Sequence, residues 1–339
     1  MSFKRLTPSD FLVSADSITS PCWTGNVYDL SSFATSSAQA ASSQGDYVLA
    51  VYQTSSILDE AAIQFYIAYT NAAGSGSTPY NSILPQYSPS STLYGQYRNL
   101  ILEDENSGFV FGNVTQSQFF ALSVERANYK QSLLPGSLNL TLSGSGTAKL
   151  HLTDNSNDVS VVPYINGTRV YQIISGSNGS AYSGTGYTTA SGSYGWFVPD
   201  MGTILLNAVA LGLPAGAGGG LGVTISSGSS VANGANNTIM YNAIRLGDSF
   251  KLNSQENVTS DYVFIRPQNA EFNYTTNPSF ISGSTGEVIY SQFINNPQTY
   301  ITTVGLYNDA NELLAVAKLS RPLVKDFTKE ALIRVKLDF

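Results

Sequence analysis

The sequence is poor in the residues from which many catalytic and metal sites are built. Its 339 residues include one cysteine, Cys22, and one histidine, His151. A single cysteine excludes an intrachain disulfide and a cysteine-based metal site, and a single histidine excludes a histidine-pair metal site. Any Ser-His-Asp triad would depend on His151, which lies in the strand-like run KLHLTD. A structural role is therefore the stronger interpretation of this histidine.

Charged residues are also scarce, at 12% of the chain, and the formal net charge is −7. Lysines and arginines are scattered and form no basic block that could follow a phosphate backbone. This composition argues against nucleic acid as a partner. No apolar run approaches the length of a membrane span, and no signal-peptide core follows the N-terminus. We therefore expect a protein that is made in a cytoplasm and has no membrane span.

Motifs for nucleotide binding and acyl transfer are missing as well. No serine lies in a GxSxG elbow, residues 216–222 lack the GxGxxG spacing, and no GxxxxGK occurs. The adjacent acids Glu103, Asp104 and Glu105 follow a predicted helix and indicate a solvated helix end. Residues 154–158 alternate oxygen side chains as calcium loops do, but the later glycine and glutamate are missing, which favours a polar turn. The sequence predicts no cofactor, no metal and no enzymatic activity.

The abundant residues are Ser, Gly, Thr, Asn and Tyr, a composition that favours short strands and turns over helices. Runs such as 46–54, 63–70 and 119–126 are rich in β-branched and aromatic residues, which predicts strands. Amphipathic spacing predicts helices near 89–102 and 238–247. We expect a mainly β fold with a few short helices: antiparallel sheets, a β-sandwich-like core and a loop-rich insertion.

Changes in composition divide the chain into three expected parts. Residues 1–142 form a β-rich part with the helix near 89–102. Residues 143–237 alternate Gly/Ser-rich segments with short apolar runs, which indicates a β insertion or second lobe. Residues 238–339 supply a helix, a β-hairpin and a closing strand, and we expect this part to pack back on the N-terminal part.

The clearest strand pattern lies in the last forty residues. Apolar runs at Tyr300–Tyr307 and Leu313–Leu319 flank the turn-forming residues 308–311, which predicts a hairpin. A helix competes for the second run because Glu, Leu, Ala and Lys are good helix formers, but the run is short between its turn and the next proline. We expect a connection through Arg321-Pro322 and then a closing strand over 331–339, where apolar and polar residues alternate to the last position.

This region also carries a family resemblance. The segments EFNYTTNPSFISGSTGE and NPQTYITTVGLYNDANELLAVAKLSRPLVKDF resemble the C-terminal region of virion structural proteins of large contractile-tailed bacteriophages, encoded among the tail and baseplate genes. GLYNDANELLAVAKL is similar to a hairpin of phage tail-fibre attachment proteins. TLYGQYRNLIL, FALSVERANYKQSLLPGSLNLTL and YGWFVPDMGTILLN are similar to other blocks of such proteins.

The resemblance implies a virion structural protein of the tail region, assembled in the host cytoplasm. Its implied partners are baseplate, tube or fibre-attachment subunits, and it implies several symmetric copies. The alternatives are a tail-associated glycan-binding or polysaccharide-degrading protein, since exposed aromatics of 181–197 could stack on sugars, and a neck or capsid-associated structural protein. A bacterial adhesin is disfavoured by the expected lack of a signal peptide. The candidate assembly interface consists of Tyr300, Val304, Leu306, Tyr307, Leu314, Val316, Ile333, Val335, Leu337 and Phe339.

Overall fold

The computed structural model describes residues 3–35, 48–54, 61–74, 90–144, 149–188, 190–215, 219–223, 225, 233–273, 277–295 and 297–338. This part of the chain is mainly β, its sheets are antiparallel and its helices are short, which confirms the expected fold class. It divides into two units. One unit is Ile18–Glu256, and the other combines Met1–Ser17 with Asn257–Phe339.

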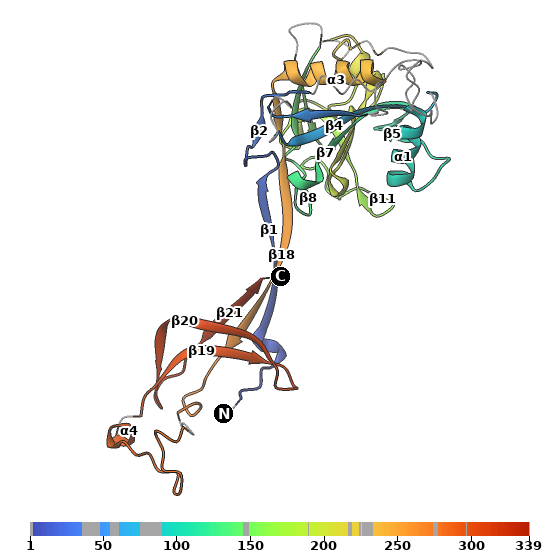
Figure 1. Ribbon diagram of the computed structural model, residues 1–339. Helices are drawn as coiled ribbons and strands as arrows, with labels where there is room; N and C mark the ends of the chain where they lie inside the picture. The colour runs from blue at the N-terminus through green and yellow to red at the C-terminus, as the bar shows by residue number, and fades with distance from the viewer. Residues whose placement is uncertain are drawn as a thin grey trace. The chain divides into compact units, whose positions relative to one another are not determined.

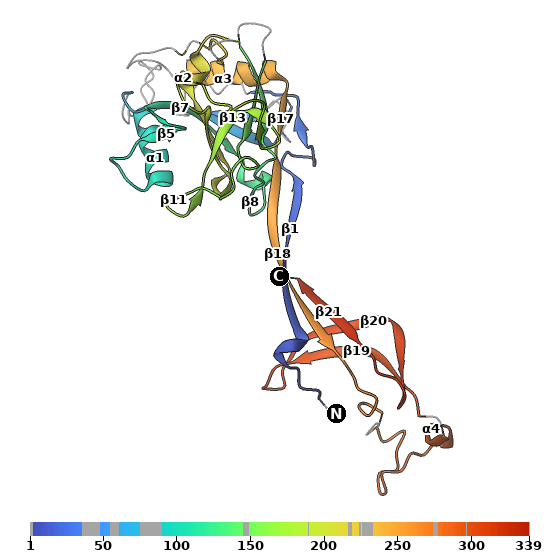
Figure 2. The ribbon, with the colours of Figure 1, turned by 180° about the vertical axis from the view of Figure 1, so that it is seen from behind.

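The larger unit, Ile18–Glu256, is built on one antiparallel sheet that curls around its core (Figures 1 and 2). The expected sandwich-like core is thus formed by a single large sheet. From one edge to the other its strands are β2 (Asp29–Leu30), β17 (Ser249–Lys251), β9 (Asn139–Ser143), β10 (Lys149–Asp154), β13 (Tyr171–Ser177), β15 (Gly195–Val198), β16 (Thr203–Asn207), β7 (Gln118–Val124), β4 (Ile63–Asn71) and β3 (Leu49–Tyr52), and β14 (Ser180–Ala181) pairs with β13.

Both faces of this sheet are buried in its central strands. Consecutive residues of β7 alternate between two apolar clusters: Phe120 and Leu122 belong to the main core, and Phe119 and Ala121 to a second cluster. Helix α3 (Asn233–Gly247) contributes to the main core. Helix α1 (Ser90–Leu102) and the ribbon of β5 (Phe109–Phe111) and β6 (Val114–Gln116) contribute to the second. The central strands are therefore apolar on both sides, which is why their sequences lack a clean alternation.

Short elements complete the larger unit. They are η2 (Arg126–Asn128), β8 (Ser132–Leu133), the hairpin of β11 (Tyr164–Ile165) and β12 (Thr168–Arg169), η3 (Pro199–Met201) and α2 (Ala208–Gly212). Asn207 caps α2, because its side-chain oxygen accepts hydrogen bonds from the backbone N–H groups of Val209 and Ala210. Within the described ranges, no helix is long and apolar enough to cross a membrane.

The units do not divide at residues 142 and 237, where composition changes. Strand β9 pairs with β10 on one side and with β17 on the other, with Leu140 opposite both Leu152 and Phe250. Strand β17 also pairs with β2, with Phe250 opposite Leu30. One sheet therefore joins all three expected parts. The observed division falls inside two long strands, β1 (Phe11–Pro21) and β18 (Asn253–Ile265).

The smaller unit, Met1–Ser17 with Asn257–Phe339, contains a sheet in the order β1-β18-β21. Strand β21 (Ile333–Asp338) pairs antiparallel with β18, from Ser260 opposite Asp338 to Ile265 opposite Ile333. A hairpin of β19 (Thr299–Tyr307) and β20 (Leu313–Lys325) forms a second, two-stranded sheet beside it (Figure 1). The short elements η1 (Pro8–Asp10) and α4 (Ser291–Asn295) complete this unit.

Candidate interaction surface

The predicted C-terminal hairpin is confirmed, and its turn is held by one side chain. The Asn308 side-chain oxygen accepts hydrogen bonds from the backbone N–H of Ala310 at 3.0 Å and of Glu312 at 2.8 Å. Asn311 has a φ of +62°, a left-handed conformation that asparagine tolerates better than most residues. The second run, for which a helix competed, is a strand.

The expected connection through Arg321-Pro322 is wrong, because β20 continues through both residues to Lys325. Ile301 lies opposite Leu323, while Thr303 lies opposite Lys318, so the register shifts between these pairs. The extra residues on β20 form a bulge that contains Pro322. A proline is tolerated there because a bulge interrupts the hydrogen-bond ladder and needs no N–H at that position.

The hairpin covers the apolar side of the closing strand. In β21, Ile333 and Val335 are buried and Leu337 is half-buried, while Arg334 and Lys336 are exposed, which confirms the predicted alternation. Val263 of β18 forms the buried core of the smaller unit together with Ile333 and Val335, and Leu337 packs against this core. Hairpin side chains packed against this core are Ile301, Val304, Leu306, Ala317, Leu319 and Leu323. The cover of the closing strand is therefore this chain itself.

The candidate interface residues consequently fall into two groups. Buried in the core of the smaller unit, or packed against it, are Val304, Leu306, Ile333, Val335 and Leu337. Exposed on the hairpin are Tyr300, Tyr307, Leu314 and Val316. Phe339 lies outside the described residues. Of these residues, the exposed group alone can meet a partner without unfolding the unit.

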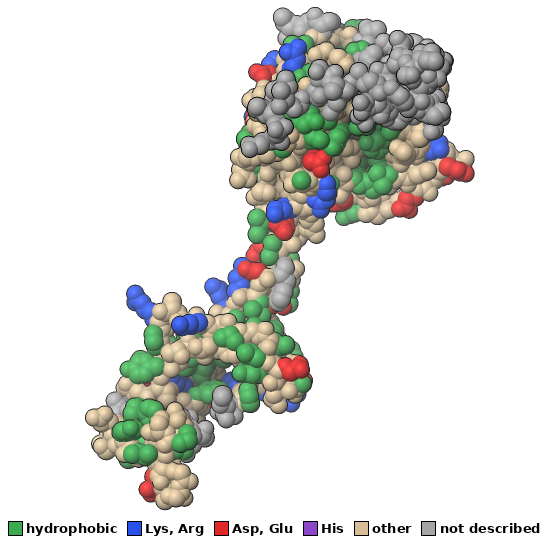
Figure 3. Space-filling view, viewed as in Figure 1, with side chains coloured by type: hydrophobic (Ala, Val, Ile, Leu, Met, Phe, Trp, Pro, Cys, Tyr) green, Lys and Arg blue, Asp and Glu red, His purple; other side chains and the backbone are tan. Residues whose placement is uncertain are grey.

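The outward side of the hairpin is apolar over a continuous stretch. Leu314 is 67% exposed and Val316 is 59% exposed. The Tyr307 ring lies over Gly305, because a Cβ on Gly305 would come within 2.9 Å of the ring. Phe3 packs edge-on against Tyr307, with ring centroids 5.2 Å apart. We call Phe3, Gly305, Tyr307, Leu313, Leu314 and Val316 the outer hairpin face. Figure 3 shows apolar side chains, in green, at the surface of this unit.

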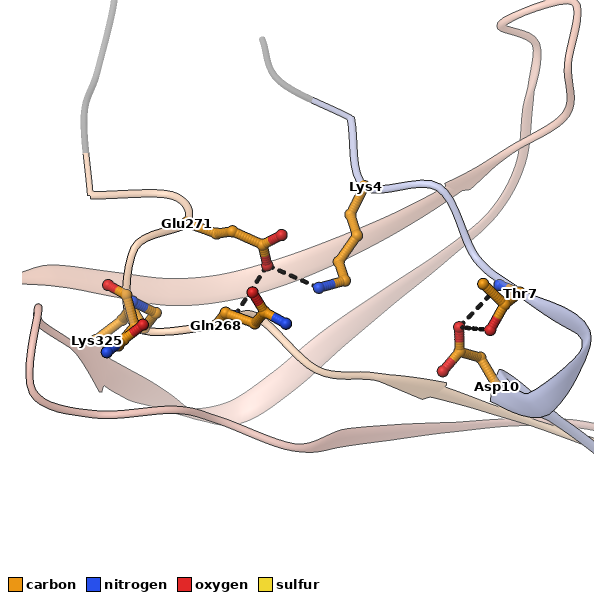
Figure 4. A network of polar contacts seen from close by, with 7 residues as sticks. Lys4, Thr7, Asp10, Gln268, Glu271 and Lys325 are labelled. Atoms are coloured by element: carbon orange, nitrogen blue, oxygen red, sulfur yellow. Dashed lines mark hydrogen bonds and ion pairs between the residues drawn. The ribbon is translucent and has the colours of Figure 1, made fainter.

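Polar contacts hold the N-terminal segment that carries Phe3 (Figure 4). Lys4 Nζ lies 2.7 Å from Glu271 Oε2, and the same oxygen accepts a hydrogen bond from the backbone N–H of Gln268. These two contacts, the one from Lys4 foremost, hold the pKa of Glu271 below its usual value. The Asp10 carboxylate accepts hydrogen bonds from the backbone N–H and hydroxyl of Thr7.

A buried cation anchors the far end of β20. Lys325 is fully buried, and its Nζ donates to the backbone oxygen of Asn269 at 2.9 Å and to Asn273 Oδ1 at 3.0 Å. It also donates to the backbone oxygen of Asp326. These three acceptors satisfy a charge that would be costly to bury alone. These hydrogen bonds fix the end of the hairpin opposite its turn, which helps to hold the outer hairpin face in place.

The hairpin also leaves strand edges unpaired. Among the described residues, β19 and β20 pair only with each other, and β21 pairs only with β18. Exposed edges are sites where another chain can add a strand. The exposed cations Lys318, Arg321 and Lys336 lie on these strands and discourage indiscriminate edge pairing. The outer hairpin face is more apolar than these strand edges.

The other residues singled out by sequence give no catalytic arrangement. His151 is exposed, with Nδ1 3.2 Å from Thr141 Oγ1 and its ring 6.3 Å from that of Tyr182. Cys22 is buried, which raises the pKa of its thiol to about 12 and keeps it protonated. Over the described ranges, His, Cys, Asp and Glu form no group of three that could hold a metal ion.

Asp104 and Asp154 accept hydrogen bonds from neighbouring residues, and most of the aromatic candidates are buried. Hydrogen bonds from Ser107 and Asn106 lower the pKa of Asp104, the opposite of what a general acid requires. Asp154 is buried at the end of β10, where its carboxyl accepts from the backbone N–H of Gly136 and Ser156. Of the aromatics in 181–197, Tyr182 is exposed, whereas Tyr194, Trp196 and Phe197 are buried in the larger unit.

Sequence reasoning missed two features of the surface. Phe3 was not among the candidates, because nothing in its local sequence connects it with a residue three hundred positions later. Gly305 was not among them either, because its sequence neighbours do not show that the Tyr307 ring lies over it. Comparisons of the chain with protein-family models, curated proteins and solved structures found no match.

Proposed function

We propose that this chain is a structural component of a bacteriophage virion, located in the tail baseplate, and that it acts through protein–protein interfaces. The observation that carries the proposal is the outer hairpin face. It is an apolar surface that the chain leaves exposed while covering its other apolar strand face. The resemblance of residues 271–339 to virion structural proteins supplies the biological setting.

The two sides of the hairpin have different surroundings, one packed and one exposed. Its inner side chains pack on β21 and β18, so the hairpin is folded before a partner arrives. Its outer side chains, Leu314 and Val316 above all, would lose water contact only when another protein covers them. Each buried Å² of apolar surface then contributes about 25 cal/mol to association. Because the hairpin is already ordered, little of this energy is spent on ordering it.

Removing the last twelve residues would be a poor test of this role. Residues 328–339 include β21, which supplies Ile333 and Val335 to the core of the smaller unit. The truncated protein would lose that core, so failure to enter particles would follow from unfolding alone. Exposed positions give a test that leaves the fold intact.

Leu314→Asp places a charge on the outer hairpin face, and Val161→Asp is the matched control on an apolar residue of the larger unit that is 77% exposed. In phage lacking the native copy, we expect wild type and Val161→Asp to enter particles equally. Leu314→Asp should lower incorporation by about tenfold or more, the effect of losing one central apolar contact. Quantitative mass spectrometry of purified virions measures this. Absence of the wild-type chain from particles would contradict the proposed function.

A further inference from the structure

Strand β1 is an edge strand that buries none of its residues. It lies at the end of the order β1-β18-β21, and among the described residues it pairs only with β18 (Figures 1 and 2). Eight of its eleven residues are exposed and the other three are half-buried. A strand uses alternate backbone N–H and C=O groups for one neighbour, so the remaining groups point to its other side. We call this side, over residues 11–16, the open edge of β1.

Large apolar side chains occupy the first three positions of the open edge. Phe11 is 50% exposed, Leu12 is 55% exposed and Val13 is 65% exposed. Successive residues of a strand point to opposite sides, so Leu12 lies on one side of the sheet and Phe11 and Val13 lie on the other. Both sides of β1 are therefore apolar and open to solvent at these positions. In β19 and β21, by contrast, one side packs on the core of the smaller unit.

Charges that discourage strand addition are nearly absent from β1. Lys318 and Arg321 lie on β20 and Lys336 lies on β21, whereas the one charged residue of β1 is Asp16. Lysine and proline are residues that commonly block an edge strand, and β1 has no lysine and no proline before its last residue, Pro21. A long, exposed, apolar edge of this kind is a site where another chain adds a strand.

We propose that the open edge of β1 receives an extended strand from a different protein, which continues the sheet beyond β1. The inference rests on the proposed function, because the partner is another protein of the same particle, and it concerns a surface other than the outer hairpin face. The occupant is a polypeptide strand because its repeating N–H and C=O groups match those of the open edge. It has apolar residues beside residues 11–13 and a basic or uncharged polar residue beside Asp16.

A second copy of this chain matches the open edge poorly. If residues 11–16 of two copies paired antiparallel over their whole length, Phe11 would lie opposite Asp16 and Leu12 opposite Ala15. If they paired parallel and in register, Asp16 would lie level with Asp16 of the second copy, and like charges placed in this way destabilise a strand pair. The order of residues in β1 thus favours a different protein as the occupant.

Hydrogen exchange gives the first test, because an added strand protects the amides that face the open edge. The purified chain and the chain within purified virions are compared peptide by peptide with mass spectrometry. We expect about half of the amides of residues 12–16 to exchange fast in the purified chain. In virions these amides should exchange at least about tenfold more slowly, because they donate to carbonyl groups of the added strand.

Competition between variants gives the second test. Val13→Lys places a charge at an exposed position of the open edge, and Val161→Lys is the matched control at an exposed valine of the larger unit. Each variant is produced together with an equal amount of wild type in phage-infected cells, and mass spectrometry measures their ratio in purified virions. Val13→Lys should be under-represented by about fivefold, the effect of losing a favourable cross-strand pair, and Val161→Lys should equal the wild type. Unchanged hydrogen exchange in β21 shows that Val13→Lys is folded.

Three outcomes would overturn the proposal. The first is exchange of residues 12–16 that is as fast in virions as in the purified chain, and the second is Val13→Lys entering virions as well as Val161→Lys does. The third is a purified wild type that forms dimers which Val13→Lys abolishes, since the occupant would then be a second copy. In the first two outcomes the chain is present in virions, so the proposed function stands. Absence of the wild-type chain from virions would contradict the proposed function, and this inference with it.

Discussion

At the scale of single residues, buried polar groups hold the irregular parts of this chain together. Lys325 gathers three oxygens at the end of β20, and Asn207 caps α2 while its amide donates to the backbone oxygens of Ser191 and Ser193. Asp154 accepts from two backbone N–H groups in separate turns. Asp154 and Lys325, the buried charged residues in the described part of the chain, therefore each have a definite set of hydrogen-bond partners.

Asp154 gives a prediction about pH. Burial raises the pKa of its carboxyl above the ordinary value of 3.8, although the hydrogen bonds from Gly136 and Ser156 oppose this. Between 3.8 and the raised value, the folded state binds more protons than the unfolded state, so this group makes stability fall as pH rises through that window. Asp154→Asn keeps an acceptor and removes the charge. We expect it to be at least as stable as the wild type at pH 7 and to lose this contribution to the pH dependence.

Urea unfolding of both proteins between about pH 4 and pH 8 measures the effect. Asp154→Ala is the control, because it leaves the backbone N–H groups of Gly136 and Ser156 without their acceptor. It should lose about 1–3 kcal/mol at every pH. If Asp154→Asn lost as much as Asp154→Ala at pH 7, the carboxylate would be ionised there and its charge would be stabilising.

At the scale of elements, the C-terminal hairpin shows what local pattern can and cannot predict. The alternation in β21 and the turn residues 308–311 are local signals, and both predicted the observed structure. The bulge around Pro322 cannot be predicted from local sequence, because it depends on how β20 pairs with β19. The exposed or buried state of Tyr307 and Leu306 follows from which side packs on β21, which periodicity alone does not assign.

The turn of this hairpin depends on a left-handed residue, Asn311, with a φ of +62°. Asn311→Gly should change the stability of the smaller unit by no more than about 0.5 kcal/mol, because glycine adopts this conformation freely. Asn311→Val should cost about 1–2 kcal/mol, because its β-branched side chain clashes with the backbone there. Hydrogen exchange of amides in β19 and β20 measures both. Equal protection in the two variants would show that the turn does not limit hairpin stability.

At the scale of the whole molecule, the two units could not be derived from the order of residues. Met1–Ser17 belongs with Asn257–Phe339, and β2 pairs with β17 across more than two hundred positions. The boundaries fall within β1 and β18, where the chain has no glycine-rich break or linker. The sequence patterns predicted no strand at residues 11–21 or 29–30, and the pairing of such strands is decided by distant segments.

The units also differ in how much apolar surface each buries. The larger unit encloses two apolar clusters, which include Phe65, Phe120 and Phe250. In the smaller unit, the buried apolar core among the described residues is Val263, Ile333 and Val335, with half-buried side chains around it. Stability follows buried area, so the smaller unit should open at a lower free energy than the larger one.

Paired core substitutions test this difference. Val335→Ala removes methyl groups from the core of the smaller unit and should cost it about 1–3 kcal/mol. Leu205→Ala makes a larger cavity in the larger unit and should cost it about 2–5 kcal/mol. In hydrogen exchange followed by mass spectrometry, Val335→Ala should speed exchange in β19, β20 and β21 and leave β7 and β16 unchanged. Equal acceleration in all five strands would mean that the chain opens as one cooperative body. A response confined to the smaller unit would mean that this unit can open locally while the larger unit stays folded.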